Sequence, residues 1–201
     1  MEIQTPRQQK ALETKQRILR TALALFSAKG FDDVSVDEIV RKSETSKGAF
    51  YGHFSSKYDI FLEKFKEIDQ FYSDFQQSLP AELSAEDKIR KLAIAQMEYL
   101  SDEMGRDGIR SLYAYALTPS VDNYLSDTER PLYAILEKLI FEGQQKGELA
   151  SSTAPGRLAM FISRSMRGTL YDWAIFDGNF DLTSEIDRLL ELLFTGLRIT
   201  K

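Results

Sequence analysis

Cysteine is absent from the 201-residue chain, and histidine occurs only once, as His53. The missing thiols exclude disulfide bonds, thiolate nucleophiles and cysteine-ligated zinc, and a single imidazole excludes a histidine-rich metal site. Metal-ligand spacings and glycine-rich phosphate loops are missing as well, and nothing singles out a catalytic pair of carboxylates. We therefore expect a protein that is not an enzyme and that has no metal site and no cofactor.

Long hydrophobic runs are also missing. Without about 18 consecutive apolar residues, no segment is predicted to span a membrane, and the polar residues 1–17 do not resemble a signal peptide. Hydrophobic residues make up 43% of the chain and charged residues 28%, which is typical of a globular protein in solution. The length predicts one large domain or two small ones, and we expect a cytoplasmic location.

Positive charge is scarce over the whole chain. The net charge is −5 and the pI is about 5.1, which at first argues against a nucleic-acid partner. However, residues 1–66 contain 12 Lys and Arg against 9 Asp and Glu, whereas residues 67–201 contain 14 against 22. A nucleic-acid surface is therefore expected only in the first third. That third also has an acidic patch, formed by Asp32, Asp33, Asp37 and Glu38.

Only five prolines occur, and strand-like alternation is rare, whereas apolar residues recur at spacings of three and four almost throughout. The predicted class is all-α, with nine or ten helices in two domains. Residues 1–56 are expected to form a small head, in which the first helix ends at Gly30. Residues 57–201 are expected to form a larger body. Further helices are predicted at about 35–42, 47–54, 57–79, 84–103, 107–117, 121–146, 154–177 and 182–199.

The head contains two short predicted helices joined by a four-residue turn. Ser35 and Glu38 have the spacing of a capping box, and polar residues 43–46 separate this helix from the next. With a longer helix before them, the two helices predict a helix-turn-helix. Two glycines in so short a second helix, Gly48 and Gly52, indicate that its backbone comes close to a partner, because each costs about 1 kcal/mol relative to alanine.

The polar, aromatic and basic side chains of the head also have simpler structural explanations. A lone His53 is ordinarily a surface or packed histidine, and Tyr51 can pack on the preceding helix. Phe50 and Phe54, four residues apart, fit the core of the head better than a wedge into DNA. A basic series in the first helix is either a solvated face or an arm along the phosphate backbone, and consists of Arg7, Lys10, Lys15, Arg17 and Arg20.

Residues 13–62 resemble the DNA-binding domain of the tetracycline-repressor (TetR) family of bacterial transcriptional regulators. The resemblance rests on the order and spacing of Ile18-Leu19, Ala22, Leu25-Phe26, Lys29-Gly30-Phe31, Val34-Ser35-Val36, Ile39, Ser46 to Phe54, and Ser56-Lys57. It implies that the contacts to DNA come from Ser35, Val36, Lys47, Gly48, Ala49, Tyr51, His53 and Lys57. Lys47 is expected at base edges, and Tyr51, His53 and Lys57 at phosphates.

The sequence departs from the family pattern in the turn between the two helices. The family has Ala-Gly-Val-Ser where this chain has Ser43-Glu44-Thr45-Ser46. Glu44 replaces a glycine that often adopts a positive φ, so we expect a strained or reshaped turn. Gly52 replaces a larger and sometimes basic residue, which removes one potential contact.

The body resembles the family mainly in residues 132–149 and 157–182. There the resemblance implies a small-molecule effector site and a homodimer in which the last two helices of each chain form a four-helix bundle. The predicted interface residues are Leu158, Ile162, Ser165, Gly168, Thr169, Ile186, Leu189, Leu190, Leu193 and Leu197. An intramolecular core competes with this reading at each position.

Effector pockets combine apolar and aromatic walls with a few polar anchors. The predicted lining consists of Phe71, Phe75, Met97, Leu100, Met104, Arg110, Tyr113, Phe161, Arg164 and Trp173. The aromatic residues favour a flat or greasy effector, and the acidic body favours a cation; the sequence does not decide between them, and most of these residues fit a plain core equally well.

The predicted function is a ligand-responsive transcriptional repressor that binds a palindromic operator as a homodimer and is released by a small-molecule effector. The alternative is a helical ligand-binding or protein-interaction module whose head no longer binds DNA. Glu44 and the acidic patch support this alternative.

Overall fold

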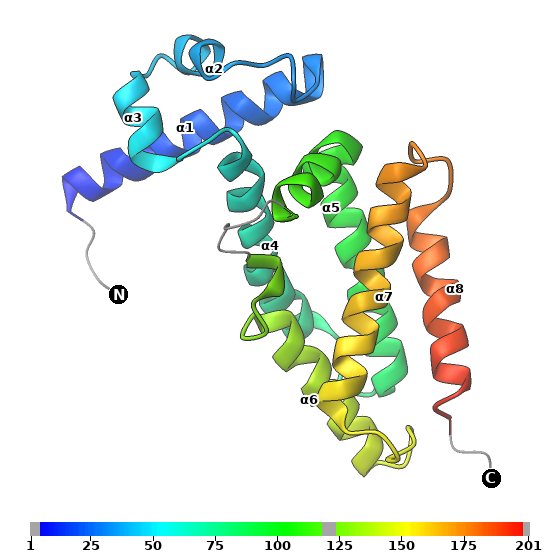
Figure 1. Ribbon diagram of the computed structural model, residues 1–201. Helices are drawn as coiled ribbons and strands as arrows, with labels where there is room; N and C mark the ends of the chain where they lie inside the picture. Colours follow the sequence, from blue (N-terminus) through cyan, green and yellow to red (C-terminus); the bar gives the residue numbers. More distant parts are fainter. Residues whose placement is uncertain (1–4, 118–123, 199–201) are drawn as a thin grey trace.

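The computed structural model describes residues 5–117 and 124–198, and all regular structure there is helical (Figure 1). Eight α-helices and one 3-10 turn lie in these ranges, against the predicted nine or ten. The all-α class is confirmed. Part of the predicted helix at 121–146 falls on residues 121–123, which lie outside the described residues.

The head consists of α1 (Pro6–Lys29), α2 (Val36–Lys42) and α3 (Lys47–His53). Gly30 ends α1 as predicted, with a φ of 85° that favours glycine. The apolar side chains of all three helices meet in one small core, which contains Ile18, Ala22, Phe26, Val34, Ile39, Phe50 and Phe54. Because α2 and α3 have only seven residues each, this shared burial and the end caps hold them in place rather than helix propensity.

Helix α4 (Tyr58–Ser78) begins in the head and runs into the body (Figure 1). Its first turns contribute Phe61, whose ring centroid lies 5.0 Å from that of Phe26 and 5.2 Å from that of Phe31. The same helix packs along α5 (Ala85–Ala116) and α6 (Pro131–Gln145) lower down. One rigid element therefore joins the head to the body.

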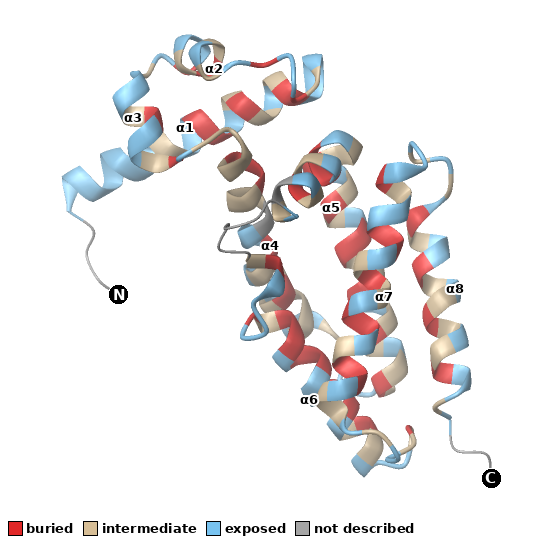
Figure 2. Ribbon diagram, viewed as in Figure 1, coloured by how far each residue is buried: buried red, intermediate tan, exposed pale blue. Residues whose placement is uncertain are grey.

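The body is completed by α7 (Pro155–Ile175) and α8 (Leu182–Thr195), which pack on each other and on α5. Buried residues lie along the sides of these helices that face one another, and exposed residues along the outer sides (Figure 2). A short 3-10 turn at Tyr124–Ser126 precedes α6. Within the described residues, no helix is long and apolar enough to cross a membrane.

Two interruptions of the body helices fall where the sequence indicates them. The break predicted between 103 and 107 is present as a kink within α5, where Gly105 has a non-helical φ of 63° and ψ of 175° between two helical segments. Within the span predicted as 121–146, the long helix begins at Pro131, because proline fits the first turn of a helix, where its missing N–H has no partner to lose.

Candidate nucleic-acid interface

The start of α2 is held by a cap and by an ion pair to α1. Ser35 Oγ accepts a hydrogen bond from the backbone N–H of Glu38 at 3.2 Å, which is half of the predicted capping box. The Glu38 carboxylate instead accepts from Lys29 Nζ at 2.5 Å, and this bond lowers the pKa of Glu38. Ser35 and Val36 are thereby fixed at the leading edge of α2.

Helix α3 has one buried and one exposed side. Phe50 and Phe54 are buried in the head core, so the core reading of these two rings is confirmed. On the other side Lys47 and Gly48 are exposed, and Tyr51 keeps 55% of its surface accessible with its ring edge-on to Phe50. The structure therefore directs the predicted contact residues away from the core.

The two glycines of α3 have no role inside the chain that explains them. A Cβ at Gly52 would meet no atom within 4 Å, and one at Gly48 only Ser46 Oγ at 3.8 Å. Both are helical and neither has a positive φ. Since alanine would favour the helix by about 1 kcal/mol at each position, the fold itself does not account for either glycine.

The turn between the two helices has the shape that the family's glycine allows. Glu44 adopts a φ of 51°, in the left-handed region. A non-glycine residue there costs roughly 1–2 kcal/mol, so the prediction of a strained turn is confirmed. Buried Ser43 supports the turn through a contact of 2.8 Å between its Oγ and Thr45 Oγ1.

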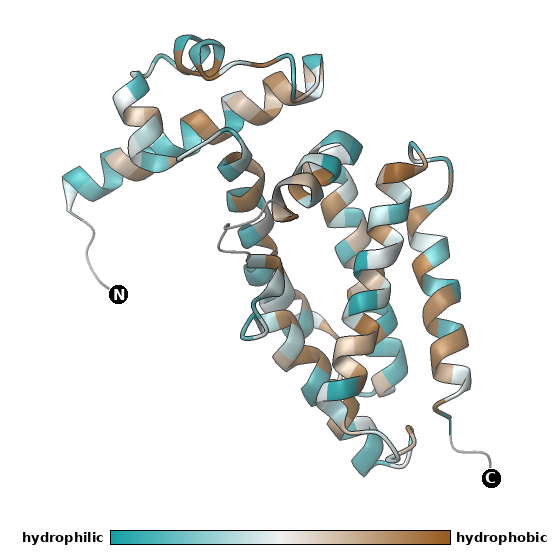
Figure 3. Ribbon diagram, viewed as in Figure 1, coloured by the Kyte–Doolittle hydropathy of each residue, from teal (hydrophilic) through white to brown (hydrophobic). Residues whose placement is uncertain are grey.

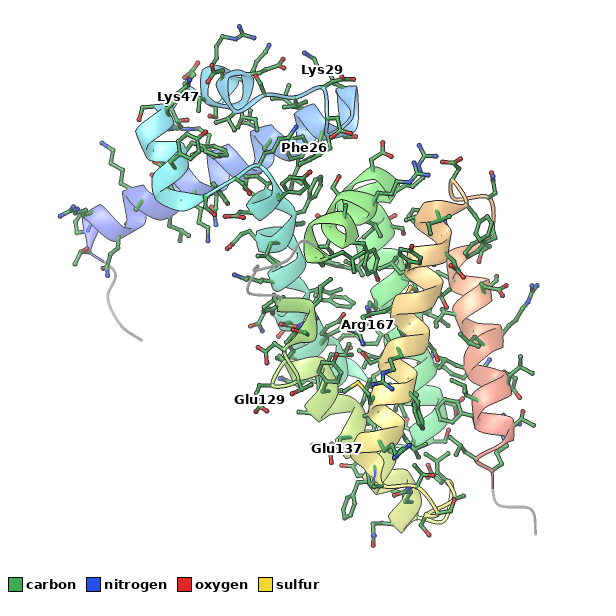
Figure 4. The ribbon with its side chains drawn as sticks, in the orientation of Figure 1. Phe26, Lys29, Lys47, Glu129, Glu137 and Arg167 are labelled. Atoms are coloured by element: carbon green, nitrogen blue, oxygen red, sulfur yellow. The ribbon has the colours of Figure 1, made fainter. Side chains whose placement is uncertain are left out.

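Lys47 is paired with an acidic residue of the neighbouring helix. Its Nζ lies 2.6 Å from Asp37 Oδ1, and the hydrogen bond that Lys47 donates to this carboxylate raises the pKa of Lys47. Figure 4 shows Lys47 at the start of α3, beside α2. The sequence shows Asp37 only as part of an acidic patch, because the approach of α2 and α3 that pairs it with Lys47 is a tertiary contact.

Lys57 has a different role from the predicted phosphate contact. Its Nζ donates to the carbonyl oxygens of Phe31 at 2.7 Å, Val34 at 3.0 Å and Asp32 at 3.3 Å, and lies 4.2 Å from the centroid of the Phe31 ring. An ammonium group has three N–H donors, so these carbonyls engage all of them. Lys57 thus braces the loop that leads into α2.

We call the outward surface of α2 and α3 the recognition surface and define it by Ser35, Val36, Lys47, Gly48, Ala49, Tyr51 and His53. Val36, Ala49 and His53 are half-buried, and the others are exposed. The His53 ring lies edge-on to Phe54, with 6.4 Å between centroids. The predicted residues other than Lys57 therefore lie at the starts of α2 and α3 and along one side of α3.

The predicted effector residues are distributed over different parts of the body. Met97, Leu100 and Met104 are buried in the core, whereas Phe71 and Phe75 are half-buried in an open groove on α4. The others lie near or on α7. Arg110 and Tyr113 border a hollow of about 240 Å³ with Tyr171 and Ile175, Trp173 packs under the loop at Gly178, and Phe161 and Arg164 are exposed.

Five of the ten predicted interface residues belong to the core of a single chain. Leu158, Ile162, Thr169, Ile186 and Leu190 are buried against the rest of the body, which fits the competing prediction of an intramolecular core at these positions. The other five, Ser165, Gly168, Leu189, Leu193 and Leu197, lie toward the outer side and are half-buried or exposed, although the three leucines also pack partly against the core. Each helix has two apolar stripes, and the more regular inner one faces α5.

The outer side has apolar residues that the sequence analysis missed. They are Ile175 and Phe176 at the end of α7 and Leu192 on α8, which keeps 73% of its surface exposed. Phe161, assigned to the effector pocket, is also exposed on α7. A hollow of about 520 Å³ between the two helices is bordered by Gly168, Phe176, Phe180 and Leu189. Figure 3 shows the hydrophobic residues along α8.

Comparison with known proteins gives two family matches that together span residues 18–196. Residues 18–63 match bacterial regulatory proteins of the TetR family, and residues 61–196 match the YsiA-like protein, C-terminal region. The chain is 21% identical to the fatty acid metabolism regulator protein of Bacillus subtilis, over 90% of this chain and 94% of that protein. It is 26% identical to the transcriptional repressor DhaR of Mycobacterium sp., over 91% of each.

Solved structures show the same fold. FadR of Thermus thermophilus, a TetR-family repressor in complex with lauroyl-CoA, superposes with a TM-score of 0.74 at 20% identity, over 93% of this chain and 96% of that one. FadR of Bacillus subtilis in complex with stearoyl-CoA superposes with a TM-score of 0.73 at 21% identity, over 90% and 98%. The chain belongs to the TetR family and is a DNA-binding, ligand-responsive transcriptional regulator.

Proposed function

We propose that this protein is a repressor that binds a palindromic operator as a homodimer and leaves it when a small molecule binds the body. The observation that carries the proposal is the recognition surface, where exposed Lys47 and Tyr51 lie beside two glycines that the fold does not require. In a helix-turn-helix, the second helix enters the major groove and its first residues contact base edges.

In this proposal, a symmetric dimer places two copies of α3 in major grooves on one side of the duplex. The centres of the half-sites are then roughly 34–36 Å apart, or a multiple of that distance. Lys47 reads base edges, while Tyr51 and His53 donate to phosphates and fix the register. A dimer on a promoter obstructs polymerase without contacting it, which favours repression.

The contact between head and body offers a route for the signal. Gly108 of α5 lies directly against the Phe61 ring, because a Cβ there would be 2.8 Å from Phe61 Cε1. The same ring packs on Phe26 and Phe31 in the head, and Figure 4 shows Phe26 where α1 meets α4. Nearby, Lys64 of α4 pairs with Glu103 of α5 at 2.7 Å. A shift of α5 on effector binding therefore displaces α4 and the head together.

For the effector we propose the acyl-coenzyme A class. The support is the pair of similar solved structures with lauroyl-CoA and stearoyl-CoA and the similarity to a fatty acid metabolism regulator. The apolar, aromatic-rich body also suits a greasy acyl chain better than a cation, so we propose the greasy one of the two effector classes that the sequence leaves open. Effector and operator then weaken each other's binding by the same factor.

One buried polar atom fits a ligand inside the body. Gln96 Oε1 on α5 is buried and has no hydrogen-bond partner among the described residues. An unpaired buried group costs roughly 1–3 kcal/mol, so a ligand that supplies a donor to Gln96 gains affinity from pairing it. This supports an effector that approaches α5 at Gln96.

We also propose that the protein has no catalytic activity and acts in the cytoplasm, where the bacterial chromosome is accessible. Both follow from the regulator function. The similar proteins are transcriptional regulators. Within the described residues, no group of three His, Asp or Glu side chains is arranged to hold a metal ion.

The test is a titration of the 201-residue protein, at two salt concentrations, against a duplex that this protein has enriched from a random pool. Wild type is expected to bind tightly and to weaken as salt rises. Tyr51→Phe removes only the hydroxyl group and is expected to weaken binding about tenfold per head, since a hydrogen bond to a charged group contributes about 1.5–3 kcal/mol.

Tyr171→Phe is the matched control, because Tyr171 is an exposed tyrosine of the body. It is expected to leave DNA binding unchanged. Addition of lauroyl-CoA to the wild-type complex is expected to release the duplex, whereas free coenzyme A is not. Enrichment of no sequence from the pool contradicts the repressor proposal and favours a module whose head has lost DNA binding.

A further inference from the structure

Asp37 places a negative charge beside the recognition surface, where the phosphates of a bound duplex would repel it. It lies in the first turn of α2, directly after Ser35 and Val36 of the recognition surface. Its Oδ1 lies 2.6 Å from Lys47 Nζ at the first position of α3, so it joins the starts of the two helices. Both side chains are well exposed, Asp37 by 66% and Lys47 by 62%, and a duplex on this surface meets them together.

Two other acidic residues nearby, Glu38 of α2 and Asp59 of α4, have partners away from this surface. Glu38 accepts from Lys29 at the end of α1, and Asp59 accepts from the backbone N–H of Ser55 and from its hydroxyl group. Asp37 differs because its partner is the one lysine that the recognition surface contains. The pair therefore bears on DNA binding and not only on the stability of the head.

The ion pair between Asp37 and Lys47 is expected to affect binding to DNA of arbitrary sequence and binding to the operator differently. On DNA of arbitrary sequence, binding arises almost entirely from neutralised phosphates, and each cation that contacts a phosphate releases counterions. Lys47 must leave Asp37 to make such a contact, and it leaves a carboxylate facing the phosphates. On the operator, a base edge such as guanine O6 and N7 offers Lys47 a directional contact that offsets this loss.

We propose that Asp37 is a specificity-determining residue, which holds the Lys47 ammonium away from phosphates and so weakens binding to non-operator DNA more than binding to the operator. The inference rests on the proposed function, because it requires that the recognition surface meets a duplex. Asp37 acts through Lys47 and is a positioning residue for it.

The experiment compares wild type with Asp37→Asn on two duplexes, one of random sequence and one enriched by wild-type protein. Affinity is measured between 50 and 200 mM salt, the range over which phosphate contacts change binding strongly. The variant is expected to bind random DNA about tenfold more tightly per dimer. The slope of log affinity against log salt is expected to steepen by roughly one to two, since each added phosphate contact contributes about 0.9. Affinity for the enriched duplex is expected to change less than about threefold.

A double-substitution cycle separates action through Lys47 from general repulsion. If Asp37 acts through Lys47, the effect of Asp37→Asn on random DNA is expected to fall below about twofold in a Lys47→Gln background. Glu98→Gln is the control for net charge, because it removes one negative charge from an exposed position on α5 in the body. It is expected to leave both affinities unchanged.

Two results overturn the inference while the proposed function stands. One is an equal gain in affinity for both duplexes, and the other is an undiminished effect in the Lys47→Gln background. Failure of wild type to bind any duplex overturns the proposed function and the inference with it. The two failures are therefore distinguishable.

Discussion

The two glycines of α3 are the residues whose cost to the stability of the head is easiest to assign. Gly48 and Gly52 lie in a seven-residue helix and face open space, so the head would be more stable with alanine at either position. A protein that keeps both at a stability cost on the same side as an exposed tyrosine has a surface shaped for close approach. Replacement of such a glycine by alanine is therefore expected to stabilise the head and to weaken DNA binding.

Gly52→Ala is expected to raise the free energy of unfolding by up to about 1 kcal/mol, because alanine is the better helix former. Its methyl group is expected to weaken operator binding at least tenfold if the duplex backbone approaches α3 at that point. Thermal unfolding and the DNA titration measure the two effects on the same sample. A variant that is more stable and binds equally well would contradict close approach at Gly52.

At the scale of elements, α8 is attached to α5 by charged side chains as well as by apolar ones. Arg90 donates to both carboxylate oxygens of Asp187, at 2.8 and 2.7 Å, and to Glu191 at 2.7 Å. Arg198 bridges Glu86 and Glu191 in the same network. The hydrogen bonds from Arg90 lower the pKa of Asp187.

The lowered pKa of Asp187 determines the direction in which the stability of the protein changes with pH. Because the folded pKa of Asp187 is below its ordinary value of 3.8, the stabilisation is present above that value and is lost as pH falls through the folded pKa. Arg90→Met is expected to lower the melting temperature at pH 7 by roughly 2–4 °C, the equivalent of about 1 kcal/mol for a partly exposed network. The difference is expected to shrink at pH 3.

Arg188→Met is the control for this prediction, since Arg188 is 78% exposed and lies 3.8 Å from Glu185. It is expected to change the melting temperature little at either pH. A difference between Arg90→Met and wild type that is the same at pH 7 and pH 3 would show that packing, and not the ion pairs, accounts for the loss.

The contact between α5 and α4 gives a second prediction at this scale. Gly108→Ala places a methyl group 2.8 Å from Phe61 Cε1, and the ring has little room to move because it packs on Phe26 and Phe31. Overpacking of this kind costs about 1–3 kcal/mol. We expect a lower melting temperature and weaker operator binding, because the displaced ring belongs to the head core.

The double variant Gly108→Ala/Phe61→Leu tests whether the ring transmits this effect. The smaller leucine leaves room for the methyl group, so Gly108→Ala is expected to cost less in the Phe61→Leu background than alone. Equal costs in both backgrounds would mean that Gly108 acts through the α5 backbone instead.

At the scale of the whole molecule, the outer side of α7 and α8 is the expected dimer surface. Phe161, Ile175, Phe176 and Leu192 are exposed there, and a hollow between the two helices is bordered by Gly168, Phe176 and Leu189. Such an apolar surface on one side of a small body favours a second copy related by a two-fold axis. Both heads of a dimer are then available to one operator.

Leu192→Glu is expected to convert the dimer into a folded monomer, because it places a charge where the two chains meet. Operator affinity is expected to fall by 10²-fold or more, since the advantage of two linked heads is lost. Light scattering after size-exclusion chromatography measures the mass, and circular dichroism checks the fold. Phe141→Glu, at a 52% exposed position on α6, is the control and is expected to remain dimeric. A Leu192→Glu protein with the mass of a dimer would place the interface elsewhere.

Local patterns in the sequence were sufficient for most of the helices and for the features that begin and end them. The 3.6-residue spacing predicts the helices, Ser35 predicts the start of α2, and Gly30 ends the first helix, because these features depend on near neighbours along the chain. The strain at Glu44 follows instead from the resemblance to the TetR family, whose pattern has a glycine at this position.

Only the tertiary structure decided which of two possible partners each ambiguous side chain takes. Lys57 braces a loop more than twenty residues earlier in the chain, and Lys47 pairs with Asp37 of the neighbouring helix. Of the apolar stripes on α7 and α8, the inner one with Ile162 and Ile186 is core. Helical periodicity identifies an apolar face but not what covers it, because that depends on the packing of helices distant in sequence.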